Sequence, residues 1–238
     1  MNTPIATWLP DWPRGWEVRV VDETGSTNAD LLAAADGGAP NRTVLAARHQ
    51  TAGRGRLDRR WDAPPGANLL VSLLFRPVPE HPHVLTQRVA LAAVLACERV
   101  SGVHPELKWP NDLLVDGAKL AGVLAQARLG ADSAVVIGIG INCGWAPPEG
   151  ARLGDGVRPL ALLAELLRMY DELPVDITAL YRERLATLGL RVRVELPEGA
   201  VVGTATDVEP DGRLVVTDEA GATHRFAVGD VVHVRPAG

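Results

Sequence analysis

The chain has 238 residues, of which 47% are hydrophobic and 22% are charged, a composition typical of a globular protein with one sizeable core and a small additional domain. Its formal net charge is -5, so the surface as a whole does not attract nucleic acid and any basic site has to be local. The two cysteines, Cys97 and Cys143, form no CxxC pair, which argues against a zinc framework or a disulfide scaffold.

Residues 1–15 are rich in Pro and Trp and are expected to form an irregular arm. They contain no signal peptide, and the chain has no run of about 18 apolar residues, so we expect a cytoplasmic protein. Alternation over residues 17–22 predicts a strand. Residues 29–35 predict a helix that Ser26 or Thr27 caps.

Apolar runs and helical periodicity predict the elements that follow. Residues 50–61 are expected to form a loop rich in glycine and arginine. The predicted strands span residues 44–47, 68–75, 107–109, 112–115, 120–127 and 133–141, and the predicted helices span residues 84–100, 159–170 and 177–188.

After Gly189 the pattern changes to short β-type runs separated by turn pairs such as Asp211 and Gly212. Short strands at regular spacing predict a small barrel. The runs span residues 191–196, 201–207, 213–217, 223–228 and 231–234. We therefore place a domain boundary near residue 188, which divides the chain into the arm at 1–15, a main domain at 16–188 and the barrel at 189–238.

Lysine is rare in this chain. Of 24 basic residues, only Lys108 and Lys119 are lysines, and a GC-rich genome accounts for the excess of arginine. Lysine offers a compact point charge on a thin stem, which arginine does not replace. The two retained lysines therefore indicate close contact with an anion.

Four arginines and two glycines fall within residues 53–61. Glycine lets backbone amides approach a ligand, arginine binds phosphate or carboxylate through two bonds, and Trp61 is suited to stack on a flat ring. A solvated surface loop and a nucleic-acid contact remain alternatives for this segment. A phosphate-binding P-loop is excluded, because the GxxxxGK[ST] pattern is missing.

Residues 108–112 and 119–124 place both lysines and one carboxylate around a tight turn and the strand after it. Such a group supplies cations for phosphates or a carboxylate, while Asp112 is able to hold Mg²⁺ or to orient an amine. Gly122 admits a ligand close to the backbone. The alternative, a hairpin with surface charges, is disfavoured by the rarity of lysine.

Two further motifs are weaker. Residues 138–142 (Gly-Ile-Gly-Ile-Asn) end an apolar strand, and by themselves they favour a strand end with a bulge. Residues 25–28 (Gly-Ser-Thr-Asn) favour helix capping, with hydrogen bonding to a polar ligand as the alternative.

Together these motifs resemble the biotin–protein ligase family. The matching segments are residues 25–28, 50–56 with Trp61, 108–112, 119–124 and 138–142, in the family's order. The resemblance implies an α+β fold, with a central mixed β-sheet, helices packed on one side as in class II synthetases, and a C-terminal SH3-like β-barrel. The N-terminal extension is too short for a helix-turn-helix, so the chain resembles the ligase-only form. Asp58 stands where the family commonly has glycine.

The resemblance implies ATP-dependent activation of biotin to biotinyl-5'-AMP, followed by transfer of biotin to a lysine of a biotin carboxyl carrier protein. Mg²⁺ is expected to be held mainly by the phosphates of ATP. The implied catalytic residues are Lys119, Arg56 and Asp112. The implied biotin-binding residues are Ser26, Thr27, Asn28, Gln50, Gly53, Arg54, Gly55, Arg56, Lys119 and Gly122, and the implied nucleotide-binding residues are Arg56, Arg59, Trp61, Lys108, Asn111 and Asn142.

Two other functions remain open. A lipoate–protein ligase resembles the same fold and uses the same activation chemistry, although Gln50 and the intact Lys-Trp-Pro-Asn-Asp segment at 108–112 favour biotin. A non-enzymatic nucleic-acid-binding protein is the other alternative. We expect neither nucleic acid nor a membrane as partner, and a monomer or a homodimer.

Overall fold

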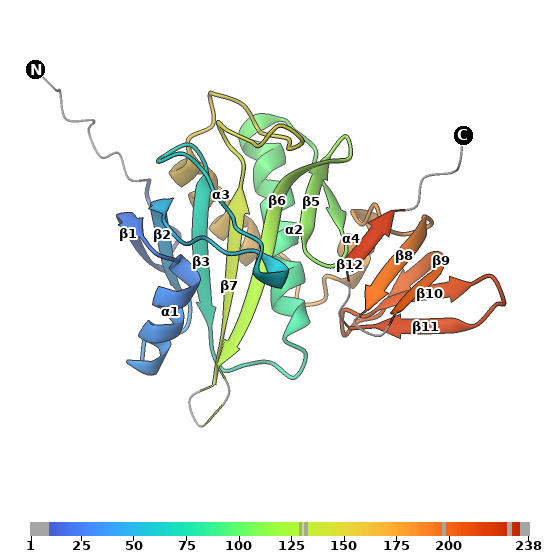
Figure 1. Cartoon of the computed structure of the whole chain (residues 1–238). Helices are drawn as coiled ribbons and strands as arrows, with labels where there is room; N and C mark the ends of the chain where they lie inside the picture. The colour runs from blue at the N-terminus through green and yellow to red at the C-terminus, as the bar shows by residue number, and fades with distance from the viewer. Residues whose placement is uncertain (1–9, 129, 131–132, 197–198, 228–229, 234–238) are drawn as a thin grey trace, which may run out of the picture.

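The computed structural model describes residues 10–128, 130, 133–196, 199–227 and 230–233 (Figure 1). The strands of the larger sheet are β1 (Glu17–Thr24), β2 (Thr43–Gln50), β3 (Leu69–Phe75), β4 (Glu106–Lys108), β5 (Asp112–Val115), β6 (Ala118–Arg128) and β7 (Ala134–Ile141). The helices are α1 (Thr27–Asp36), α2 (His83–Ser101), α3 (Pro159–Glu172) and α4 (Thr178–Glu183), with a 3-10 turn η1 at Arg56–Asp58. None of the described helices is long and apolar enough to cross a membrane.

The larger sheet has the strand order β1-β2-β3-β7-β6-β5-β4. Strands β1 and β2 are parallel, and every other neighbouring pair is antiparallel. A parallel pair needs a crossover connection, which α1 provides between β1 and β2. The predicted mixed sheet is therefore confirmed.

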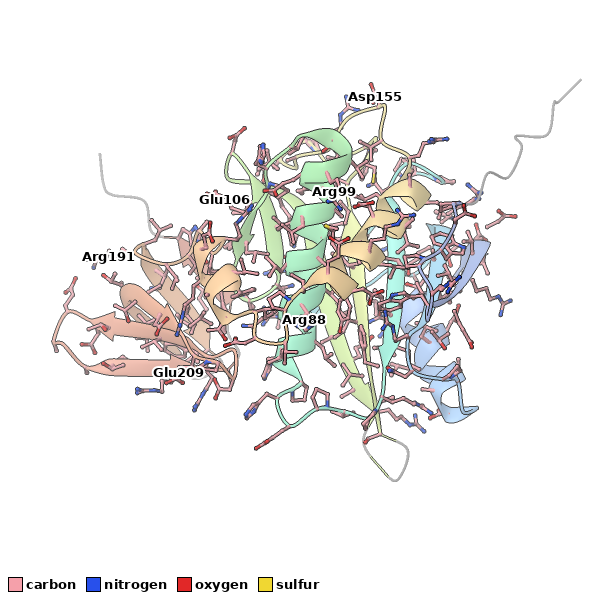
Figure 2. All side chains as sticks on the ribbon, turned by 180° about the vertical axis from the view of Figure 1, so that it is seen from behind. Arg88, Arg99, Glu106, Asp155, Arg191 and Glu209 are labelled. Atoms are coloured by element: carbon pink, nitrogen blue, oxygen red, sulfur yellow. The ribbon has the colours of Figure 1, made fainter. Side chains whose placement is uncertain are left out.

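Helices cover both faces of this sheet. Successive side chains of a strand point to opposite faces, so Leu73 of β3 lies in the core under α2 and α3, while Leu74 packs with Leu31 and Ala35 of α1. Figure 1 shows α1 in front of the sheet, and Figure 2 shows α2 and α3 across its back. The expected mixed sheet with helices is present, but the expectation that the helices pack on one side is wrong: α2 and α3 lie on one side, and α1 lies on the other.

The predicted helix at residues 177–188 is too long. Helix α4 ends at Glu183, because the backbone that follows pairs with β4. Leu107 N donates to Arg184 O at 2.8 Å, and Ala186 N donates to Leu107 O at 2.8 Å. The carbonyl of Arg184 and the N–H of Ala186 are therefore not available for the hydrogen bonds between residues i and i−4 that would continue the helix. The helices predicted at residues 84–100 and 159–170 are confirmed within two residues at each end.

Strand β2 is longer than predicted and includes Gln50, which we had expected in the loop. Its pairing with β1 continues to the partners Thr24 and Gln50. The backbone of Gln50 is therefore held at the end of a strand, so its side chain extends from a fixed position.

The smaller sheet contains β8 (Arg191–Leu196), β9 (Gly199–Val208), β10 (Leu214–Asp218), β11 (Thr223–Phe226) and β12 (Asp230–His233). Its order is β11-β10-β9-β8-β12, and all neighbours are antiparallel, as expected of an SH3-like barrel. Part of the last predicted run lies outside the described residues. The domain boundary near residue 188 stays a prediction.

Trp109 connects the two sheets. Its ring is 2% exposed, and Nε1 donates to the carbonyl of Gly212 in the β9–β10 turn at 3.0 Å. Its backbone N donates to Oγ1 of Thr187 at 3.0 Å, and that hydroxyl lies 3.2 Å from Nε2 of His233 in β12. The turn after β4 is thus anchored on the barrel.

Candidate active site

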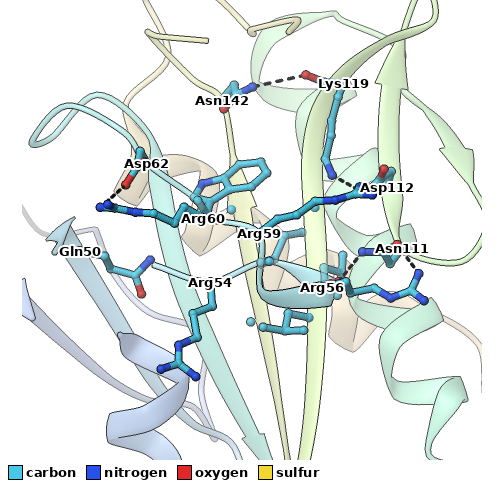
Figure 3. Close-up of a pocket in the computed structure, with 18 of the residues that line it drawn as sticks. Gln50, Arg54, Arg56, Arg59, Arg60, Asp62, Asn111, Asp112, Lys119 and Asn142 are labelled. Carbon is cyan, nitrogen blue, oxygen red and sulfur yellow. Dashed lines mark hydrogen bonds and ion pairs between the residues drawn. The ribbon is translucent and has the colours of Figure 1, made fainter. Parts of the chain in front are cut away.

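A cavity of 610 Å³ lies on the face of the large sheet that carries α1. Its floor is made by the glycines of β6 and β7, and the loop at residues 53–61, here called the arginine loop, crosses in front of it (Figures 1 and 3). Every predicted site residue except Gly53 and Lys108 lines this cavity. The lining set therefore contains Ser26, Thr27, Asn28, Gln50, Arg54, Gly55, Arg56, Arg59, Trp61, Asn111, Asp112, Lys119, Gly122 and Asn142.

The two exceptions lie close by. Gly53 is buried at the start of the arginine loop, where an added Cβ would lie 2.3 Å from the carbonyl oxygen of Trp61 at its end. Lys108 lies toward the barrel instead: burial, followed by the positive charge of Lys108, lowers the pKa of His233 in β12. Lys108 is thus off the cavity wall, and its position does not favour the nucleotide contact that we expected.

One end of the cavity is polar, where α1 begins beside the end of β2. Ser26 is the N-cap residue but its side chain makes no capping bond, so the predicted hydroxyl cap is wrong. Instead Oε1 of Gln50 accepts from the backbone N of Thr27 at 2.8 Å and from its Oγ1 at 3.0 Å. A neighbouring strand therefore caps the helix, and the Ser26 side chain remains on the cavity wall.

A buried hydrogen-bond chain supports this end. The Oγ of Ser72 donates to Oδ1 of Asn28 at 2.5 Å and lies 2.7 Å from Oγ1 of Thr27. Nδ2 of Asn28 donates to Oε1 of Gln126 at 2.8 Å and to the carbonyl of Leu124 at 3.3 Å. Both acceptors are carbonyl oxygens, which cannot donate a hydrogen bond. The NH₂ group of Asn28 must therefore face them, and this fixes the orientation of its amide.

Glycines make the floor flat. Gly122 and Gly140 lie opposite each other in β6 and β7, and a Cβ on Gly140 would lie 2.4 Å from the indole of Trp61. A Cβ on Gly138 would lie 2.2 Å from Oδ1 of Asn28. Strand β7 pairs without any register shift on either side, so the predicted bulge is wrong. These glycines allow close approach of other side chains to the backbone.

The arginine loop closes on itself. Arg54 and Arg60 form an antiparallel bridge, and Gly55 N donates to the carbonyl of Arg59 at 2.6 Å. At its tip Leu57 has φ 54°, in the left-handed region, and its side chain is 68% exposed. A leucine in this conformation is strained by roughly 1–2 kcal/mol, and this strain favours a change in the conformation of the loop tip. The side chain of Asp58, which stands where the family commonly has glycine, lies outside the described residues.

Arg56 ties the loop to the body of the protein. Its guanidinium donates to Oδ1 of Asn111 at 3.1 Å (Figure 3). Asn111 is itself fixed on β6, since its Nδ2 donates to the carbonyl of Val123 at 2.9 Å and its own carbonyl accepts from Val123 N at 2.8 Å. The arginine loop and the turn after β4 thus meet directly at the cavity.

Lys119 and Asp112 form an ion pair on the cavity wall, with 2.7 Å between Nζ and Oδ1. The ammonium also lies 5.7 Å from the centroid of the Trp61 ring. The Lys119 side chain is 43% exposed, so an incoming anion has access to it. A partly buried ammonium beside several guanidinium groups is suited to bring two anionic reactants together.

Asn142 is buried and supports the wall from behind. Its Nδ2 donates to the carbonyls of Lys119 at 3.3 Å and Ala151 at 3.0 Å, and its Oδ1 accepts from Nδ2 of Asn68 at 3.1 Å. Both N–H groups of this amide are therefore engaged within the protein. The nucleotide contact that we expected of Asn142 stays a prediction, and the geometry favours a supporting role.

Sequence reasoning missed several residues of the site. Ser72 is fully buried within the apolar strand β3, and Asn68 is 2% exposed directly before it. Lone polar residues beside or within an apolar run are a usable signal, because burial of a polar group requires a hydrogen-bond partner. The wall segment that includes Trp145 and Glu149 carried no such signal.

The described residues contain no group of three or more His, Cys, Asp or Glu side chains suited to hold a metal ion. Among the described side chains, the carboxylates that line the cavity are Asp62, Asp112 and Glu149, and two of them are paired with cations: Asp62 with Arg60, and Asp112 with Lys119. This donor set fits a magnesium ion that is held mainly by phosphate oxygens of a bound nucleotide.

Comparison with known families gives two matches. Residues 20–142 match the Biotin/lipoate A/B protein ligase family, and residues 187–234 match the Biotin protein ligase C terminal domain. The chain is 41% identical to the biotin--[acetyl-CoA-carboxylase] ligase of Mycobacterium tuberculosis, over 93% of this chain and 91% of that protein. It is 31% identical to the ligase of the same name from Paracoccus denitrificans, over 84% and 90% of the two chains.

Among solved structures, the fold is similar to the biotin protein ligase from Aquifex aeolicus in complex with biotin and ATP. The TM-score is 0.76 at 27% identity, and the match covers 92% of this chain and 99% of the other. The family matches and the similar solved structure point to the same family. The chain belongs to the Biotin/lipoate A/B protein ligase family and carries the C-terminal domain of biotin protein ligases.

Proposed function

We propose that this protein activates biotin with ATP as biotinyl-5'-AMP and transfers the biotinyl group to a lysine of a carrier protein. One observation carries the proposal: a single cavity has hydrogen-bonding side chains at one end and Lys119 with the arginine loop at the other. A ligand that fits has a polar head, a short chain and an anionic end. Relatives that are named biotin--[acetyl-CoA-carboxylase] ligases support this reading.

The polar end would bind the ureido ring of biotin. Ser26, Thr27 and Gln50 surround this end, and Asn28 fixes it from below. Nε2 of Gln50 is a donor, whereas Oε1 already accepts from Thr27, so the amide would donate to the ureido carbonyl. The dithiolane ring of lipoate has no comparable hydrogen-bonding groups, and this end of the cavity therefore favours biotin.

In the first half-reaction the carboxylate oxygen of biotin attacks the α-phosphorus of ATP, and the bond to pyrophosphate breaks. Two anions have to meet, which requires fixed cations at the point of contact. Lys119 would lie at the carboxylate and α-phosphate oxygens, while Arg54 to Arg56 close over the chain. When bound, Mg²⁺ neutralises charge on the phosphates.

The nucleotide would extend past Lys119 toward the turn after β4. Arg56, Arg59, Trp61 and Asn111 line this part of the cavity. The guanidinium groups would bind phosphate oxygens, and the indole offers a flat surface for a ring.

In the second half-reaction the carrier amine attacks the carbonyl carbon of the mixed anhydride, and AMP leaves. Asp112 would orient this amine and accept its proton. An anion bound at Lys119 competes with Asp112 for the ammonium, which would free the carboxylate for that role.

The test is pyrophosphate exchange into ATP that depends on added biotin. We expect exchange with biotin and none with lipoate. Exchange that depends on lipoate instead would support a lipoate ligase. Nucleic acid bound without ATP, with an affinity that falls steeply with salt, would support the binding-protein alternative.

A further inference from the structure

The orientation of Lys119 depends on a β-bulge. Strands β5 and β6 pair Leu113 with Ala121 but Leu114 with Lys119, so Leu120 is an extra residue in β6. Leu120 and Ala121 consequently both point into the main core, although they are adjacent. If β6 alternated regularly with the same sequence, Leu120 would point to the cavity and Lys119 to the core side, because a shift of one residue moves a side chain to the other face. The bulge therefore directs Lys119 to the cavity.

Asn142 binds the carbonyl groups of both residues at the bulge, Leu120 and Lys119. Its backbone N donates to the carbonyl of Leu120 at 3.0 Å. Its side-chain Nδ2 donates to the carbonyl of Lys119 at 3.3 Å and to that of Ala151 at 3.0 Å. Ala151 N also donates to the Lys119 carbonyl at 2.9 Å. Asn142 thus holds the bulge and the wall segment together.

The amide of Asn142 needs a defined orientation for this, and Asn68 provides it. Nδ2 of Asn68 donates to Oδ1 of Asn142 at 3.1 Å in a buried contact. Oδ1 of Asn68 accepts from the backbone N of Cys143 at 3.0 Å and of Trp145 at 3.2 Å. Because Oδ1 of Asn68 faces two donors, its Nδ2 is the group that faces Asn142. The direction of each hydrogen bond is therefore fixed: Asn68, just before β3, donates to Asn142, just after β7, and Asn142 donates to Lys119 in β6.

We propose that Asn68 is a positioning residue for Lys119 in biotin activation. It touches neither substrate nor the cavity, and it acts by holding the Asn142 amide that supports the bulge. This inference rests on the proposed function of the cavity. A positioning role differs from a purely stabilising one in what a substitution of Asn68 changes. We expect such a substitution to lower the rate of adenylate formation and to leave biotin binding unchanged.

Asn68→Asp removes this one contact selectively. The carboxyl keeps the acceptor for Cys143 N and Trp145 N, but when ionised it places a second acceptor against Oδ1 of Asn142. Asn142 then either rotates, which places its oxygen against the Lys119 carbonyl, or moves away. When protonated, the carboxyl donates to Oδ1 and restores the original order. Burial and the facing Oδ1 of Asn142 raise the pKa of this carboxyl, whereas its two backbone N–H donors lower it, so we expect protonation only at acidic pH.

The experiment measures biotin-dependent pyrophosphate exchange for wild type and Asn68→Asp across pH. At pH 8 the kcat of the variant should fall at least about tenfold, since a shift near 1 Å at a reacting group has effects of this size. KM for biotin should change by less than about threefold, because the ureido end is untouched. The ratio of variant to wild-type kcat should rise once the pH falls below the pKa of the introduced carboxyl.

Leu73→Ala is the control for lost stability, because Leu73 is fully buried in the same strand but packs on the other face of the sheet. It should keep wild-type kcat at temperatures where it is folded, and its ratio to wild type should not depend on pH. In a second experiment, the double variant Asn68→Ala, Asn142→Ala should have the same kcat as Asn142→Ala alone. Asn68 acts through the Asn142 amide, so its loss should have no further effect once that amide is absent.

A kcat of Asn68→Asp equal to wild type at pH 8 would overturn the inference. So would additive effects of the two alanine variants. Absence of biotin-dependent exchange in the wild type would instead remove the proposed function, so the two failures are distinguishable.

Discussion

Asp112 and Gly122 are direct partners in β5 and β6, and Asp112 meets Lys119 across the bulge that follows, with 2.7 Å between Oδ1 and Nζ. The acid and the base therefore come from one hairpin. Their mutual distance is set by the sheet rather than by a mobile loop. In the proposed reaction the ammonium would serve the first half-reaction and the carboxylate the second.

Lys119→Ala should leave biotin binding partly intact but lower adenylate formation by roughly 10²–10³-fold, because it removes the charge at the reacting oxygens. Pyrophosphate exchange and biotin binding by calorimetry measure the two effects. Arg128→Ala is the matched control, since it removes a cation from the same strand outside the cavity. Exchange near the wild-type rate in Lys119→Ala would contradict the assignment.

Asp112→Asn should slow transfer to the carrier by about 10²-fold, and it should slow adenylation less, since the amide cannot accept a proton. Single-turnover transfer from preformed biotinyl-5'-AMP separates the two steps. Asp62→Asn, which changes a carboxylate of the cavity wall that pairs with Arg60, is the control. Equal losses in both half-reactions would refute a specific role in transfer.

Gly140→Ala should displace Trp61, because the added Cβ would lie 2.4 Å from the indole. We expect kcat/KM for biotin to fall about tenfold, as a shifted ring narrows the cavity. Gly156→Ala is the control, since a Cβ there meets no atom within 4 Å. If the two variants have equal kcat/KM, the close approach of Trp61 is not needed for activity.

The arginine loop should be cut by trypsin in the unliganded protein and protected when biotin and ATP are both present. Its strained tip at Leu57 and its exposed arginines favour opening, and bound anions would pair with the arginines. Mass spectrometry of timed digests identifies the cleavage sites. An unchanged cleavage pattern would mean that the loop does not close over the reactants.

The barrel should lose stability as the pH falls, through His233. Burial, and next the charge of Lys108, lower the pKa of this imidazole in the folded protein. The unfolded chain then binds protons more readily than the folded one below a pH of about 6.5, so stability is present above that pH and is lost as the pH falls toward the lowered pKa.

His233→Gln should flatten this dependence of Tm on pH between about pH 7 and pH 5. His81→Gln, which replaces an exposed histidine outside the barrel, should leave the dependence as in the wild type. An identical pH dependence of Tm in His233→Gln and wild type would show that another group is responsible.

The sequence predicted most elements because their signals are local. The apolar run at β3, the periodicity of α2 and the turn pairs of the barrel depend only on neighbouring residues. The length of α4 was wrong for the opposite reason: its end is set by hydrogen bonds to Leu107, which is distant in sequence. The same applies to the Ser26 cap, which Gln50 replaced from another strand.

By itself the sequence determined which chemical groups are present: two lysines, a segment of arginines and glycines, and the family motifs in order. Only the tertiary structure decided which groups meet. Lys119 reaches the cavity because the extra residue in β6 turns its side chain to the cavity face, whereas Lys108 in β4 lies outside the cavity lining. A register shift is a property of two paired strands, and neither strand encodes it alone.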